Sequence, residues 1–75
     1  MRWGANMVFI AQKTNIPDGV TVQITQASPL RYSVLMRDDD SGNWLPHARV
    51  YSDRQKALEY ANDILPQGEW SFFVK

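Results

Sequence analysis

The chain has 75 residues, its eight basic and eight acidic side chains cancel, and it contains no cysteine. A chain this short forms one domain with a small core, which excludes a second domain and limits stability unless the protein oligomerises. The zero net charge excludes the global positive field that draws proteins to nucleic acid or acidic membranes, and the lack of thiols excludes disulfides and thiolate chemistry.

Residues 1–6 precede the first strand-like run, and we expect them to form a flexible N-terminal tail. Residues 7–75 then form a single domain. The N-terminal segment is too short and too weakly apolar for a signal peptide, and no apolar stretch approaches the length that spans a bilayer. We therefore expect a cytoplasmic protein with no membrane partner.

Four stretches before residue 52 carry the alternation or the β-branched and aromatic residues that are typical of strands. Val20, Val22 and Ile24 alternate without a fault with polar neighbours, which predicts a half-buried strand. The polar turn Asp38–Asn43 predicts a hairpin, with Gly42 available for a positive φ. The four predicted strands are Met7–Lys13, Val20–Gln26, Arg31–Arg37 and Trp44–Tyr51.

The hairpin register follows if the apolar residues of both strands face the core. Val50 then pairs with Tyr32, and Ala48 pairs in the same way with Val34. Pro46 lies in the last of these strands, which favours an irregular beginning or an edge position for that strand. The opposite face would carry the remaining side chains, which are Arg31, Ser33, Leu35, Arg37, His47, Arg49 and Tyr51.

The stretch Ser52–Leu65 predicts the one helix of the chain. Ser52 and Gln55 have the spacing of a capping box, and Pro66 ends the helix at or just before Leu65. Apolar residues recur at helical spacing on one side, namely Ala57, Leu58, Ala61, Ile64 and Leu65. Arg54, Lys56, Glu59, Asn62 and Asp63 lie on the other side.

After the helix, Glu69–Lys75 predicts a last strand with Trp70, Phe72 and Val74 on one face and Phe73 on the other. Whether this strand pairs with Met7–Lys13 or with another strand stays open. The predicted fold is an α+β two-layer sandwich, a mainly antiparallel sheet of four to five strands with one helix packed on one face.

Few residues carry the pattern of a reaction site. The turn Asp38–Asn43 looks like a calcium loop, but a frame that puts Gly42 sixth ends at Ala48 where an EF-hand needs glutamate. His47 is the only histidine, which excludes a two-histidine metal spacing, and the short loops leave no cleft for a triad. We expect a protein without catalytic residues, metal or cofactor, and a solvated tip for the hairpin.

The sequences RYSVLMRDDDSGNW and ARVYSDRQKALEYANDIL resemble a motif of small strand–helix families. They are similar to the partial RNase H-like antitoxin domain of toxin–antitoxin pairs, through Gly42, Ser52, Ala57 and Ala61. They are also similar to the three-stranded DNA-binding modules of phage integrases, in which a helix backs a sheet. The resemblance covers about half of the chain and implies a fold only, since the antitoxin's proline–glycine loop and the integrase module's basic surface are absent.

The outer sheet face gives the functional hypothesis. We expect a small non-enzymatic interaction module, of the accessory or inhibitor type that phages and mobile elements encode, which binds a protein partner or itself as a homodimer. Aromatics that the helix cannot cover, from among Trp3, Trp44, Tyr51 and Phe73, suit such a partner. The predicted partner-binding residues are Leu35, Arg37, His47, Arg49, Tyr51 and Phe73. The alternative is a nucleic-acid-binding module that contacts phosphates through Arg31, Arg37 and Arg49 on the same face.

Overall fold

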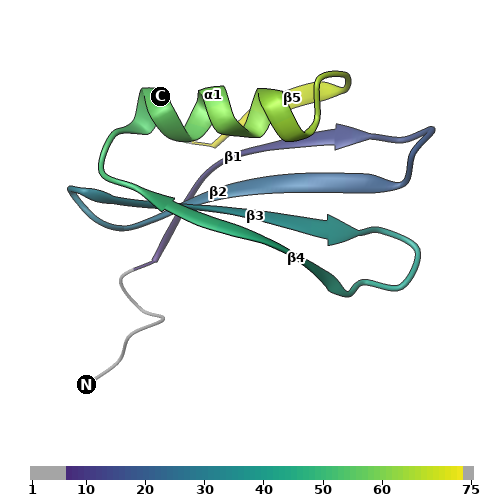
Figure 1. The fold of residues 1–75 in the computed structure, drawn as a ribbon, viewed down its shortest axis with the longest axis horizontal. Helices are drawn as coiled ribbons and strands as arrows, with labels where there is room; N and C mark the ends of the chain where they lie inside the picture. The colour runs from purple at the N-terminus through teal and green to yellow at the C-terminus, as the bar shows by residue number, and fades with distance from the viewer. Residues whose placement is uncertain (1–6, 74–75) are drawn as a thin grey trace.

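The computed structural model describes residues 7–73, leaving aside the side chains at positions 46 and 47. The expected tail at residues 1–6, Trp3 within it, and the end of the last strand at residues 74–75 lie outside this range. The elements are β1 (Val8–Asn15), β2 (Val20–Ser28), β3 (Arg31–Asp38), β4 (Trp44–Tyr51), α1 (Arg54–Ile64) and β5 (Glu69–Phe72). The predicted α+β class and element order are confirmed (Figure 1).

The strands form one five-stranded antiparallel sheet in the order β4-β3-β2-β1-β5. The four strands before the helix form a meander, so each pairs with its neighbour in sequence. Helix α1 packs on one face of the sheet against β2, β3 and β4, and returns the chain to the far edge (Figure 1). The question that the sequence left open is thereby answered, because β5 pairs with β1.

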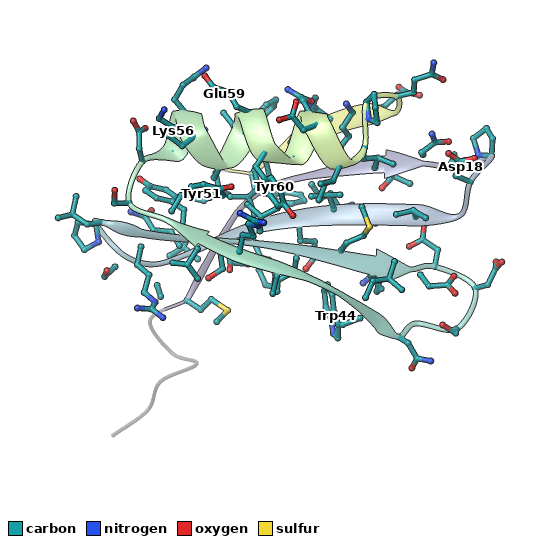
Figure 2. The ribbon with its side chains drawn as sticks, viewed as in Figure 1. Asp18, Trp44, Tyr51, Lys56, Glu59 and Tyr60 are labelled. Atoms are coloured by element: carbon teal, nitrogen blue, oxygen red, sulfur yellow. The ribbon has the colours of Figure 1, made fainter. Side chains whose placement is uncertain are left out.

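The core lies between α1 and the sheet. Val22 and Ile24 are fully buried from β2, which confirms the face assigned by the alternation of this strand. Ala57 and Ala61 are fully buried from the helix, where their small side chains let it lie close to the sheet. Lys56 and Glu59 are exposed on the opposite side of the helix (Figure 2). The remaining buried apolar residues are Ile10, Ala11, Val34, Met36 and Leu65.

The helix begins one residue later than predicted. Asp53, not Ser52, is the N-cap, and its Oδ1 accepts a hydrogen bond of 2.8 Å from the Gln55 backbone N–H. Two good capping residues stand side by side here, and the one that adopts an extended backbone and reaches an amide two residues on takes the role. The end of the helix at Ile64 agrees with the prediction.

The predicted register of the β3–β4 hairpin is wrong. Tyr32 pairs with Tyr51 and Val34 with Arg49, not with Val50 and Ala48. Asp38 donates its backbone N–H to the Asn43 carbonyl at 2.9 Å, which closes the turn and sets the pairing next to it. An irregularity between Val34 and Met36 then follows, at which the two steps from Val34 to Met36 oppose the four steps from Arg49 to Leu45.

This shift reverses the faces of the β4 side chains, because side chains alternate along a strand. Tyr51 packs against Tyr60 of α1, with ring centroids 5.7 Å apart, and the Arg49 guanidinium lies 5.1 Å from the Tyr60 ring centroid. Arg49 and Tyr51 therefore lie on the helix side of the sheet, contrary to prediction. The helix offers an aromatic surface at this edge, which pairs better with Tyr51 and Arg49 than with the smaller Ala48 and Val50.

Candidate protein-binding face

The sheet has a second face, which we call the open face, on the side away from α1. Strand register assigns side chains to it in rows that run across the sheet. Figure 2 shows Tyr51 and Tyr60 between α1 and the sheet, and Trp44 on the side away from the helix. The side chains of the open face are Phe9, Gln12, Thr14, Thr21, Gln23, Thr25, Arg31, Ser33, Leu35, Arg37, Trp44, Val50, Glu69, Ser71 and Phe73.

Two phenylalanines form one corner of the open face, which we call the phenylalanine corner. Phe9 is 53% exposed and Phe73 is 55% exposed. Together with Gln12 and Gln23 they line an open hollow of about 450 Å³. Gln23 donates from Nε2 to Gln12 Oε1 at 3.5 Å, so two amide groups line this hollow together with the two aromatic side chains. Such a surface can bind an apolar side chain that also has a hydrogen-bonding group.

Trp44 and Arg37 form a second corner, which we call the tryptophan corner. The Trp44 side chain is 51% exposed, and the Arg37 guanidinium carbon lies 5.6 Å from its ring centroid. Arg37 Nε is also 3.5 Å from Asp39 Oδ1. The arginine thus lies between a ring and a carboxylate, which limits the positions that Trp44 can take.

Asp39 is held from several sides. Thr21 Oγ1 donates to both Asp39 oxygens, at 2.9 and 3.0 Å, and the Asp39 backbone N–H donates to the Gly19 carbonyl at 2.8 Å. Because the Thr21 hydroxyl hydrogen points to Asp39, Thr14 is the donor in the 3.1 Å contact between the two threonines. This carboxylate therefore orders the tryptophan corner. Among the side chains that the structure describes, no cluster of three or more acidic, histidine or cysteine groups suits a metal ion.

The predicted partner-binding residues divide between the two faces. Leu35, Arg37 and Phe73 lie on the open face, whereas Arg49 and Tyr51 lie on the helix side as described above. The His47 side chain is outside the described part of the structure. The arginines of the nucleic-acid alternative do not all share a face, since Arg31 and Arg37 lie on the open face by alternation along β3, whereas Arg49 is on the helix side.

Sequence reasoning left Phe9, Gln12, Gln23, Trp44 and Val50 out of the partner-binding set. The polar neighbours in Val20–Gln26 already placed Gln23 on this face, so its position was available from alternation. Phe9 belongs to an unbroken apolar run, in which no alternation marks the exposed side, and an irregularity between Phe9 and Ala11 changes the phase of the strand. Its exposure could not be predicted from the pattern.

No helix in residues 7–73 combines the length and the apolar character that crossing a bilayer requires. Comparison of the chain with protein-family models, with curated proteins and with solved structures gives no match. The resemblance to antitoxin and integrase modules therefore rests on the quoted residues alone.

Proposed function

We propose that this chain is a small non-enzymatic interaction module that binds another protein through its open face. The observation that carries the proposal is the group of half-exposed aromatic side chains, Phe9, Trp44 and Phe73, on a sheet face turned away from the only helix of the described residues. Large exposed apolar groups that share one surface mark interaction sites more often than singly scattered ones do. A chain without cysteine fits action in the reducing cytoplasm.

The character of the open face favours a protein over nucleic acid. Aromatic residues and arginine are the side chains that dominate protein–protein hot spots. A phosphate-binding face needs several available cations, but Arg37 is engaged by Asp39 and Arg49 is on the other face, so of the three predicted arginines only Arg31 remains for a phosphate. The net charge of zero also provides no long-range attraction to a polyanion.

Matched substitutions on the two faces test the proposal. Phe73→Asp places a charge on the open face, whereas Phe72→Asp places the same charge at a neighbouring residue that stacks on Trp70 on the helix side, with similar exposure. We expect partner proteins captured with the tagged wild-type chain to be retained by Phe72→Asp and lost with Phe73→Asp, as quantified by mass spectrometry. Equal capture by both variants would show that the open face is not the binding surface.

A second measurement distinguishes the protein-binding proposal from the nucleic-acid alternative. Light-scattering mass is recorded during size-exclusion chromatography with fragmented DNA at low and moderate salt. We expect no co-elution at either salt. Co-elution at low salt that is lost at moderate salt, and that Arg31→Ala and Arg37→Ala abolish, would replace the protein-binding proposal with phosphate binding.

A further inference from the structure

The two corners of the open face lie diagonally opposite each other. Trp44 pairs with Arg37, Arg37 with Thr21 and Thr21 with Thr14, so Thr14 marks the row of Trp44 on β1. Phe9 is five residues before Thr14 on the same strand. The irregularity between Phe9 and Ala11 adds one residue to β1, so this span corresponds to the four residues from Thr21 to Thr25 on β2. With strand geometry of about 3.3 Å per residue and about 4.8 Å between strands, the corners are about 13 Å apart along the strands and about 14 Å across them.

A two-fold axis can exchange these corners. The axis lies in the plane of the open face, along the diagonal that joins the two remaining corners. Rotation about it places the tryptophan corner of one copy over the phenylalanine corner of the other, and the reverse contact forms at the same time. The strands of the two sheets then cross at nearly a right angle, which is one of the two packing geometries that stacked sheets adopt.

The chemistry of the two corners is complementary. Half of the Trp44 surface is available, and Arg37 holds the ring in place, so the side chain is ordered before it binds. The opposite hollow of about 450 Å³ has room for an indole between the rings of Phe9 and Phe73. The indole N–H needs an acceptor when it is buried, and the side-chain amides of Gln12 and Gln23 supply oxygens at that place.

The size and charge of the face suit a second copy. A face of about 24 by 26 Å covers about 600 Å², which with its side-chain relief approaches the roughly 800 Å² per partner of a standard interface. Arg31 and Arg37 on the open face are balanced by Asp39 and Glu69, so the face has no net charge that would repel a second copy. The edges are less suitable, because β5 has only four residues and β4 contains Pro46, which lacks a backbone N–H.

Building on the proposed function, we propose that the partner of the open face is a second copy of this chain. Trp44 of each copy occupies the hollow between Phe9 and Phe73 of the other, in a symmetric dimer with two identical contacts. The neighbouring Leu35 and Val50 side chains are covered by the same packing.

Sedimentation equilibrium on the full chain tests this dimer. We expect the wild-type chain to dimerise, and Trp44→Ala and Phe73→Ala each to raise the dimer Kd by about thirtyfold or more, the effect of truncating a hot-spot aromatic. Phe72→Ala is the matched control and should leave the Kd unchanged, since Phe72 stacks on Trp70. Circular dichroism shows whether each variant is folded.

The decisive experiment mixes the Trp44→Ala and Phe73→Ala variants. Each homodimer of Trp44→Ala or Phe73→Ala has lost both aromatic contacts, but the mixed dimer retains one intact Trp44–Phe73 contact and should form more tightly than either. A mixture of the two folded variants that is no tighter than the separate variants would overturn the proposed pairing.

The failure of this inference can be distinguished from the failure of the proposed function. A wild-type chain that stays monomeric at millimolar concentration overturns the dimer. If Phe73→Asp still abolishes the capture of another protein, the open face keeps its proposed role with a different partner. If neither self-association nor capture depends on the open face, both proposals are wrong.

Discussion

Gly68 has a backbone conformation that only glycine adopts readily, at the turn from α1 into β5. Its φ is +139°, and a Cβ at this position would lie 2.6 Å from the Thr14 carbonyl oxygen. The obstacle is main chain of β1, which cannot move without breaking its strand pairing. We therefore expect Gly68→Ala to lower the free energy of unfolding by about 3 kcal/mol, from strain and from the displaced backbone. Urea unfolding followed by circular dichroism measures it.

Gly42 provides the control for this prediction. Its φ is +75°, but a Cβ there would meet nothing within 4 Å. Gly42→Ala should therefore lose only the conformational term, about 1–2 kcal/mol. Equal losses for the two variants would mean that the contact with Thr14 contributes nothing at Gly68.

The sequence pattern predicts the face of some individual side chains but not of others. Alternation placed Val22 and Ile24 correctly, because β2 has an apolar residue at every second position. In β4 both parities carry apolar or aromatic residues, so the pattern permits either face. The turn bond between Asp38 and Asn43 and the Tyr51–Tyr60 contact decide the register, and neither can be read from local periodicity. Arg49 and Tyr51 were therefore assigned to the wrong side.

At the scale of elements, a buried lysine joins β1, α1 and β5. Lys13 is only 4% exposed, and its Nζ donates to Asn62 Oδ1 at 2.9 Å and to the Pro66 carbonyl at 3.1 Å. Its Nζ also lies 5.7 Å from the Trp70 ring centroid, and Trp70 Nε1 donates to the same Asn62 oxygen at 3.2 Å. One amide oxygen thus serves donors from two strands, which ties both to the end of the helix.

The two sides of this contact should respond differently to substitution. Asn62→Ala leaves the buried Lys13 cation with one acceptor fewer, so we expect the free energy of unfolding to fall by about 1.5–3 kcal/mol. Lys13→Met keeps the apolar stem and removes the cation, and water can reach the exposed Asn62, so the loss should stay below about 1 kcal/mol.

Chemical denaturation of both variants measures the difference. Asp63→Ala, at the next exposed position of α1, is the control and should be nearly neutral. A larger loss for Lys13→Met than for Asn62→Ala would show that the cation itself stabilises the fold.

The identity of the elements was predictable, whereas their connection through Lys13 was not. Turn residues separate every strand, and Pro66 fixes the helix end, so all five strands and the helix were found near their observed positions. Lys13 was the last residue of an expected strand, and its sequence neighbours give no reason for burial. Its acceptors at Asn62 and Pro66 are 49 and 53 residues away, and only the pairing of β5 with β1 brings them together.

At the scale of the whole molecule, the fold has one layer of helix on a sheet wider than that helix can cover. Helix α1 lies over β2, β3 and β4, and Trp70 with its lysine contact covers part of the helix side near β1 and β5. Nine buried apolar residues form the core of the described chain, and two of them are alanines from the helix. A core this small limits the stability of a single chain, and the proposed dimer would add to it by burying the open face.

The proposed dimer predicts that thermal stability rises with protein concentration. In a dimer whose unfolding yields separate chains, a hundredfold increase in concentration adds about 2.7 kcal/mol per dimer. Each chain gains half of this free energy, which corresponds to a rise in Tm of about 5–10 °C for a domain of this size. Differential scanning calorimetry at two concentrations a hundredfold apart, both above the dimer Kd, measures the rise.

The matched phenylalanines identify the cause of any such rise. Phe73→Ala should abolish the dependence of Tm on concentration, because the open-face contact is lost. Phe72→Ala should keep the dependence and lower the Tm at low and at high concentration by the same amount. Phe72 stacks on Trp70, whose centroid lies 5.4 Å away, so its truncation weakens each chain equally at every concentration. A Tm that does not depend on wild-type concentration would mean that the small core is sufficient by itself, and that the open face is occupied by another protein or by solvent alone.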